Sequence, residues 1–332
     1  MATLAAPAPG LLLGYAADLV VADPLRAHPV AGFGQAAARL EGALYADSRR
    51  RGTLFVAVCL GVVSGSSWLL VRTVNPGGPE ATGRPASGRP NARGLAALTA
   101  VATWSVVGGE SLARVATRLR RHLADGDIDG ARALLPSLCG RDPNALDASG
   151  LARAAVESVA ENTSDAVVAP LVWAGLAGVP GLLTYRAINT LDAMVGHRSP
   201  RYERFGWAAA RLDDLANHVP ARLTAALAVL LAPLVGGSRA AALRVLRRDG
   251  ARHPSPNAGR CEAAFAGALG VTLGGSNVYG GRAETRGPQG AGPDPSAADI
   301  ARAVRLSRAV GLAALLLVVT VRAGGRRPGA PR

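Results

Sequence analysis

The chain has 332 residues, of which 49% are hydrophobic and only 18% charged, and its mean hydropathy is positive at +0.21. Its net charge is +14, and all 37 basic residues are arginine. The lack of lysine excludes a Walker A loop and Schiff-base chemistry. A basic chain with 4% aromatic residues and no zinc or helix-turn-helix pattern gives little support for a nucleic-acid partner.

Uncharged runs in the sequence predict the membrane segments. In chain order they are residues 53–71, 94–109, 166–185, 223–238 and 309–321, and a further apolar segment at 11–22 contains Asp18. The clearest run, 53–71, follows three consecutive arginines and is long enough to cross a bilayer. The run at 166–185 contains Pro170, Gly178 and Pro180, so we expect a broken or re-entrant segment there.

The fold class that these runs predict is an all-α, polytopic integral membrane protein with helical polar loops. We expect a single membrane domain over residues 1–322 and a disordered basic tail at 323–332. Residues 81–93 and 282–298 are rich in glycine and proline and are predicted to be flexible loops, and no period-two alternation predicts a sheet. The three cysteines are too widely spaced to indicate a disulfide framework or a zinc site.

Three carboxylates spaced four residues apart form the most informative motif. Glu157, Glu161 and Asp165 would share one face of a helix, where their charges repel unless a cation lies between them. The motif borders the uncharged run 166–185, so we interpret it as a site for Mg2+ or another polar ligand. The alternative is a helix start at which acids are favoured by the helix dipole.

Four other polar motifs accompany the acid motif, and each also has a structural interpretation. His28 lies in a proline-stiffened turn, and Arg186, Asn189 and Asp192 share a helix face suited to phosphate and metal. Arg211, Asp213, Asp214 and Asn217 could form a second cation site or an internal salt bridge. His253, Asn257 and Arg260 could form an anion site at a helix start, where Asn257 is a natural N-cap.

In this order the motifs resemble those of the CobD/CbiB family, the adenosylcobinamide-phosphate synthases of cobalamin biosynthesis. The similar segments are HPV, ESVAENTSD, YRAINTLDAMVGHR, FGW, ARLDDL, PAR, HPSPNAG and LGG-N-YGG, which together extend from about residue 11 to residue 281. The family pattern has glycine where this chain has Ala22, and other residues where it has Thr163, Ala166, Arg260 and Cys261. None of these departures removes a charged motif residue.

The resemblance implies a multi-pass enzyme of the cell membrane that forms an amide. The reaction would join (R)-1-amino-2-propanol phosphate, or aminopropanol, to the free propionate carboxyl of adenosylcobyric acid, with ATP and Mg2+ as expected cofactors. Membrane lipids and other cobalamin-assembly enzymes would be its partners. A transporter or a scaffold for corrinoid biosynthesis is the alternative, because charged side chains beside broken spans also occur in transporters.

The same resemblance suggests a role for each polar motif. Glu157, Glu161 and Asp165 would bind Mg2+–ATP, and Asp213 and Asp214 would bind a second metal or orient the amine. Arg186, Arg211 and His253 would hold phosphates. His28, Asn189, Asp192 and Asn257 would contact or orient the substrate.

Overall fold

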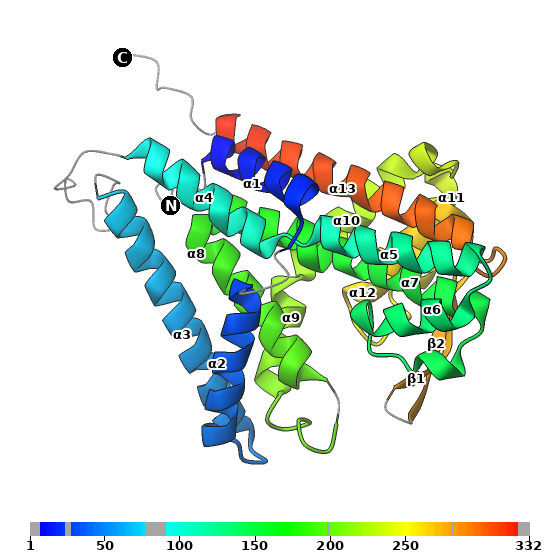
Figure 1. The fold of residues 1–332 in the computed structure, drawn as a ribbon, viewed down its shortest axis with the longest axis horizontal. Coiled ribbons are helices and arrows are strands. Elements are labelled where there is room, and N and C mark those ends of the chain that lie inside the picture. The colour runs from blue at the N-terminus through cyan, green and yellow to red at the C-terminus, as the bar shows by residue number, and fades with distance from the viewer. Residues whose placement is uncertain (1–6, 24–27, 77–90, 198, 280–281, 325–332) are drawn as a thin grey trace. The chain divides into compact units, whose positions relative to one another are not determined.

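The computed structural model describes residues 7–23, 28–76, 91–197, 199–279 and 282–324, and its ribbon is drawn in Figure 1. The chain divides into two compact units. Unit 1 comprises Met1–Gly108, Ala169–Ala216 and Leu315–Arg332, and unit 2 comprises Gly109–Val168 and Asn217–Ala314. The single domain over 1–322 stays a prediction. The predicted tail lies, from residue 325 onward, outside the described residues.

Unit 1 is built from helices, and its described elements are α1 (Ala8–Val21), α2 (Pro29–Leu44), α3 (Arg49–Val74), α4 (Ala92–Val106), α8 (Ala169–Leu191), the π-helix η4 (Asp192–Gly196), α9 (Trp207–Ala216) and the end of α13 (Ala297–Gly324). α1 lies alongside α4 (Figure 1). The close approach needs glycine, because a Cβ at Gly14 would lie 2.5 Å from the Ala100 carbonyl oxygen. Small residues at a helix contact let the backbones of two membrane helices approach each other closely.

The core of unit 1 lies among α2, α3, α8 and α9. Phe55 and Phe205 are fully buried, with ring centroids 5.3 Å apart, and Leu191 and Val195 belong to the same cluster. Gly52 brings α3 against this core, since a Cβ there would lie 1.8 Å from the Phe205 carbonyl oxygen.

Unit 2 is helical apart from one hairpin. Its described elements are α5 (Gly109–Ala124), α6 (Ile128–Leu134), the short turns η1 (Leu135–Ser137) and η2 (Pro143–Ala145), α7 (Ala148–Thr163), the π-helix η3 (Ser164–Val168), α10 (His218–Leu231), η5 (Ala232–Val235), α11 (Arg239–Asp249), α12 (Ala258–Leu269), β1 (Leu273–Tyr279), β2 (Arg282–Gln289) and the first part of α13. Its core includes Leu119, Leu135, Leu151 and Phe265, all fully buried.

Five helical stretches among the described residues are long and apolar enough to cross a membrane. They are Arg49–Val74, Ala92–Ala124, Ala148–Gly196, His218–Val235 and Ala297–Ala323, and the shorter apolar helix is Ala8–Val21. Large apolar side chains are exposed along α3, including Val62 at 65% and Leu69 at 58%. Exposed apolar surface of this kind is typical of a lipid-facing helix. The prediction of a polytopic all-α membrane protein is confirmed.

The predicted break in the 166–185 segment is also present. Gly178 in α8 has φ +66° and ψ −152°, a backbone conformation that is essentially restricted to glycine. Pro180 follows it and lacks an N–H group for the helix ladder. These two residues kink α8. Whether the segment crosses the bilayer or is re-entrant stays a prediction.

The sequence interpretation was wrong for part of the 282–298 segment. Residues 282–289 form β2, which pairs antiparallel with β1, and the register is irregular between Leu273 and Gly275. Gly274 and Gly275 have φ +88° and +86°. The positive φ values that glycine tolerates permit the irregular backbone at the start of this hairpin.

Candidate functional site: a buried charged cluster in unit 2

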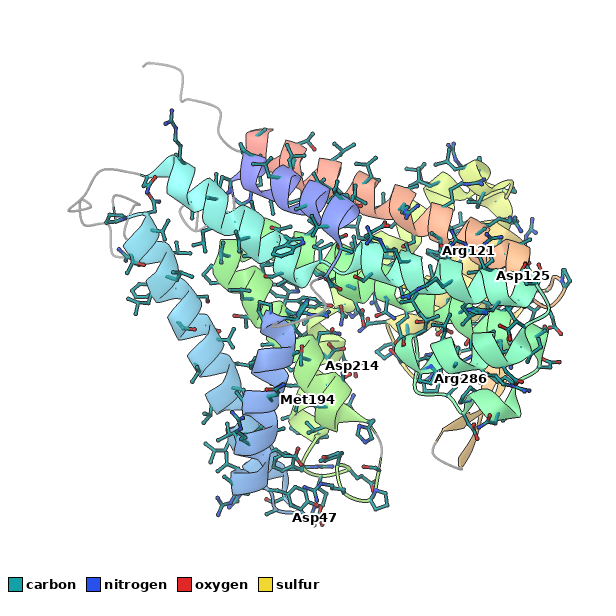
Figure 2. All side chains as sticks on the ribbon, in the orientation of Figure 1. Asp47, Arg121, Asp125, Met194, Asp214 and Arg286 are labelled. Carbon is teal, nitrogen blue, oxygen red and sulfur yellow. The ribbon has the colours of Figure 1, made fainter. Side chains whose placement is uncertain are left out.

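Charged side chains from four parts of unit 2 meet in its interior. Glu157 comes from α7, Glu262 from α12, Arg141 from the segment between η1 and η2, and Arg286 from β2. Glu157, Glu262 and Arg141 are 5% exposed or less. Figure 2 labels Arg286 on the hairpin. Because ionised groups are rarely buried without a partner, such a cluster requires a structural or chemical explanation.

Glu157 has two buried partners. Its Oε2 accepts a hydrogen bond from Nη2 of Arg141, and both side chains are almost fully buried. Its Oε1 accepts from the backbone N–H of Gly274 at 2.7 Å. A Cβ at residue 274 would lie 2.5 Å from the Gly287 carbonyl oxygen, so glycine is needed for the close approach of β1 to β2 at this point. Glu157 therefore anchors the hairpin to α7.

Glu262 differs from Glu157 in its hydrogen bonding. It is 1% exposed, and neither of its carboxylate oxygens has a hydrogen bond among the described residues. Nε2 of His253 and Nη1 of Arg286 each lie 3.8 Å from a Glu262 carboxylate oxygen. Burial raises the pKa of Glu262 well above its ordinary value, and the negative charges of Glu157 and Glu161 raise it further. A buried acid perturbed in this way is typical of a functional site.

His253 is held by the turn that precedes α12. The backbone N–H of Ser255 donates to its Nδ1 at 3.0 Å. The Ser255 carbonyl oxygen lies 3.3 Å from the same nitrogen, so Nδ1 either accepts from the N–H or donates to the carbonyl. A neutral imidazole in which Nδ1 accepts carries its proton on Nε2, the nitrogen that lies 3.8 Å from Glu262. Pro254 and Pro256 stiffen this turn.

The predicted capping role of Asn257 was wrong in detail. Asn257 occupies the N-cap position of α12, but its side chain makes no capping hydrogen bond. The Ser255 hydroxyl accepts instead from the N–H groups of Asn257 and Ala258, at 3.3 and 3.1 Å. The Asn257 Oδ1 accepts from Nη1 of Arg222 at 3.1 Å. The Asn257 side chain is thus directed to α10, where it remains a candidate substrate contact.

The acid motif continues into a π-helix. α7 ends at Thr163, and Asp165 lies in η3, so the three carboxylates do not follow one α-helical face. π-Helical turns are rare and are frequently found at functional sites. Among the described residues, no three His, Cys, Asp or Glu side chains are grouped to hold a metal ion. The metal site on Glu157, Glu161 and Asp165 stays a prediction.

Asn217 and Arg260 also belong to unit 2, and the other predicted residues lie in unit 1. Nδ1 of His28 accepts from the N–H of Val30 at 3.1 Å and so caps α2, and its Nε2 lies 3.6 Å from Oδ1 of Asp23. The Arg186 guanidinium donates to Oδ1 of Asn189 at 3.3 Å, and Asp192 begins η4.

The pair Arg211–Asp214 forms the internal ion pair that was the alternative interpretation, at 3.8 Å. Asp213 is its neighbour on α9, and Figure 2 labels Asp214 there. Partial burial raises the pKa of Asp214.

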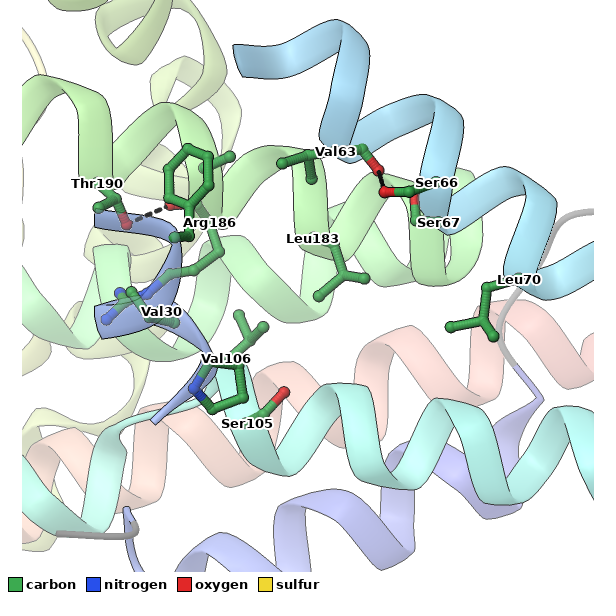
Figure 3. Close-up of a pocket in the computed structure, with 13 residues that line it drawn as sticks. Val30, Val63, Ser66, Ser67, Leu70, Ser105, Val106, Leu183, Arg186 and Thr190 are labelled. Carbon is green, nitrogen blue, oxygen red and sulfur yellow. Dashed lines mark hydrogen bonds between the residues drawn. The ribbon is translucent and has the colours of Figure 1, made fainter. Parts of the chain in front are cut away.

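Unit 1 also contains a cavity of about 260 Å3. Figure 3 shows its lining side chains, which come from α2, α3, α4 and α8 and include Arg186. The predicted polar residues are thus divided between the two units: one group belongs to unit 2, with its buried charged cluster, and the other to unit 1, with its cavity.

Sequence reasoning did not assign Arg141, Glu262 or Arg286 to the site. Glu262 carried a usable signal, because it is a single carboxylate at the start of an Ala-rich apolar helix, and such a residue is usually paired or functional. Arg286 lay in a segment expected to be a loop. Arg141 had no local signal, since only the tertiary fold brings it to Glu157.

Comparison with known proteins gives a consistent result. The model of the CobD/Cbib protein family matches residues 11–307. A cobalamin biosynthesis protein CobD of Mycobacterium tuberculosis (strain ATCC 25618 / H37Rv) is 53% identical over 310 residues, covering 93% of this chain and 94% of the relative. Proteins of the same name from Rhodobacter capsulatus and Chromobacterium violaceum are 43% and 40% identical, over 88% and 92% of this chain and 88% and 96% of their own lengths. No solved structure matches.

Fold and site together define a class: a polytopic helical membrane protein with a buried cluster of acids and arginines. The chain belongs to the CobD/Cbib family of cobalamin biosynthesis proteins. The family resemblance of the sequence motifs is therefore confirmed.

Proposed function

We propose that the protein forms the amide bond between aminopropanol phosphate, or aminopropanol, and the free propionate carboxyl of adenosylcobyric acid. Membership of a cobalamin biosynthesis family supports the corrinoid substrate. The observation that carries the chemistry is Glu262, a buried carboxylate that has no hydrogen bond within the described part of the chain and lies 3.8 Å from both His253 and Arg286.

Amide formation requires an amine that has lost its proton. A substrate amine is an ammonium ion at neutral pH, and the attacking nitrogen loses further charge to a base as the bond forms. Glu262 fits this role, because its raised pKa brings it closer to working pH than an ordinary glutamate. Nε2–H of His253 would orient the carboxylate and stabilise its negative charge.

The other reactant is a carboxylate, which is a poor electrophile and needs activation. We propose ATP and Mg2+ for this step, as the family resemblance implies. Mg2+ often uses only one or two protein carboxylates together with substrate phosphates. Glu161, one turn from Glu157 and close enough to raise the pKa of Glu262, fits this requirement. Bound Mg2+ would neutralise phosphate charge, and Arg286 would add a positive charge near Glu262.

We further propose that the enzyme acts in the cell membrane, in keeping with its five possible spans. The late corrinoid intermediates would then be handled at a membrane surface, where other cobalamin-assembly enzymes could receive the product. The pair Arg222–Asn257 supplies additional polar groups beside the α12 start for substrate contact.

A product assay tests the proposal. Detergent-solubilised full-length protein would be incubated with adenosylcobyric acid, aminopropanol phosphate, Mg2+ and ATP, and the products analysed by mass spectrometry. We expect an amide that requires both protein and ATP. Product only with free aminopropanol would change the amine donor and keep the reaction. No product with either amine, from protein shown to be folded, would overturn the proposal and favour transport or a scaffold.

A further inference from the structure

The cavity of unit 1 is elongated and almost entirely apolar. Its α3 lining extends from Val63 to Leu70, which corresponds to about 10 Å along a helix. Figure 3 shows Leu70 toward one end and Arg186, beside Val30, toward the other. The polar groups of the lining are the guanidinium of Arg186 and the hydroxyls of Ser66, Ser67, Ser105 and Thr190. The cavity therefore has an apolar body and one cationic end.

The guanidinium of Arg186 is incompletely satisfied by protein. Its Nε is buried and has no hydrogen bond among the described residues, and its Nη1 donates to the neutral amide oxygen of Asn189 at 3.3 Å. None of the described residues lining the cavity is Asp or Glu. A partly buried arginine in apolar surroundings is stabilised by an anion that accepts its hydrogen bonds.

The size and charge of the cavity limit which kind of anionic ligand it can bind. Sites for drug-sized ligands occupy roughly 300–1,000 Å3, so a cavity of about 260 Å3 is too small for a corrinoid or a nucleotide. A small amino-alcohol phosphate would fit by volume, but its ammonium would be buried without a carboxylate partner. A hydrocarbon chain matches the apolar body without this cost.

The surroundings of the cavity supply such a chain. α3, α4 and α8 all belong to helical stretches that could cross a membrane, and α3 exposes apolar side chains. In a bilayer the neighbouring molecules are therefore lipids. We propose that this cavity binds part of one acyl chain of an anionic phospholipid, whose phosphate is held by Arg186.

Photocrosslinking in lipid nanodiscs tests the proposal. The full-length protein would be reconstituted with phosphatidylglycerol that carries a diazirine in one acyl chain, and the crosslinked residues mapped by mass spectrometry. We expect labels on cavity residues such as Val63, Leu70 and Leu183. Labels confined to the outer face of α3, around Val62 and Leu69, would overturn the proposal without any variant.

Two arginine variants distinguish the effect of the cavity arginine on lipid labelling from the effect of positive charge elsewhere on the protein. Arg186→Gln removes the cation of the cavity, and we expect cavity labelling by phosphatidylglycerol to fall about tenfold, since a charge-assisted hydrogen bond contributes roughly that factor. Arg72→Gln is the matched control, because Arg72 lies on α3 over the Trp68 ring at 4.8 Å and does not line the cavity. Equal labelling in both variants would overturn the role of Arg186.

A third variant and a kinetic measurement complete the test. Leu183→Trp fills the cavity and leaves the charge in place, so cavity labelling should be lost in this variant as well. If Arg186→Gln fails to fold, Leu183→Trp still tests whether the lipid occupies the cavity. If Arg186→Gln raises the KM for aminopropanol phosphate and leaves lipid labelling unchanged, the cavity is a substrate site and the lipid proposal is wrong.

Discussion

Glu41 in unit 1 and Glu262 in unit 2 are both buried glutamates, but their hydrogen bonding differs. Glu41 in unit 1 is 8% exposed, and its Oε1 accepts from the Tyr202 hydroxyl and from Nη2 of Arg201, both at 3.0 Å. Glu262 in unit 2 is 1% exposed and has no hydrogen bond among the described residues. Burying a carboxylate without hydrogen bonds destabilises a fold, so Glu262 is better explained by function than by stability.

The largest expected effect tests this contrast directly. Glu262→Gln should reduce turnover by roughly 10²–10⁴-fold, the range for loss of a general base. Its thermal stability should be unchanged or higher, because a neutral amide costs less to bury than a carboxylate that has no hydrogen bond among the described residues. The measurements are product formation and thermal unfolding in the same detergent.

The matched variant is Glu41→Gln, which should behave in the opposite way. It weakens hydrogen bonds to a charged acceptor, so the free energy of unfolding should fall by roughly 1–3 kcal/mol while the folded protein retains turnover. If Glu262→Gln unfolds the protein and Glu41→Gln removes activity, Glu262 is the structural residue and Glu41 the one needed for turnover, which is the opposite of our prediction.

Within unit 2, Glu157 should differ from Glu262. Glu157→Gln leaves Arg141 buried without its carboxylate, and breaking a buried ion pair on one side typically costs about 3–5 kcal/mol. Unfolding of Glu157→Gln, Arg141→Gln and the double variant would measure this effect. We expect the double variant to lose less stability than the sum of the single variants. Additive losses would show that the pair does not act as a unit.

The sequence predicted the fold class because membrane helices depend on local composition. Uncharged runs such as 53–71 lie within helices long enough to span, and Gly178 and Pro180 correctly marked the break in α8. The hairpin was missed because β2 begins the segment 282–298, which is rich in glycine and proline and so has the composition of a loop. A strand is identified by its partner, which a local pattern does not contain.

The site was less predictable because its members are distant in sequence. The acid motif indicated where charge is concentrated, but the helical spacing rule fails at Asp165, where the backbone becomes a π-helix. Arg141 precedes its partner Glu157 by 16 residues, and Arg286 follows Glu262 by 24 residues. Only tertiary packing brings such residues together.

A smaller change in stability is expected from a substitution at the contact between α1 and α4 in unit 1. Its α1–α4 contact depends on close backbone approach, so Gly14→Ala should lower the free energy of unfolding by roughly 1–3 kcal/mol through overpacking against Ala100 and Thr103. Gly61→Ala on α3 is the matched control, since a Cβ there meets nothing within 4 Å. The control should gain roughly 0.5–1 kcal/mol. Equal effects at the two positions would argue against tight α1–α4 packing.

The smallest effect concerns Ala22, where the family resemblance of the sequence leads us to expect glycine. Ala22 has φ +60° and ψ −165°, a conformation that costs a non-glycine residue roughly 1–3 kcal/mol. Its carbonyl oxygen accepts from Nε1 of Trp104 at 3.0 Å, which helps to hold this backbone. Ala22→Gly should therefore stabilise the protein by about 1 kcal/mol, after the greater unfolded-state entropy of glycine is subtracted.

The same substitution in a regular helix should have the opposite sign. Ala97→Gly in α4 replaces an exposed helical alanine, and it should lower the free energy of unfolding by about 1 kcal/mol. Thermal unfolding of the two variants in one detergent compares them directly. A loss of stability in both would mean that Ala22 is not strained by its backbone. The family glycine would then need another explanation, such as a ligand that approaches the chain at this turn.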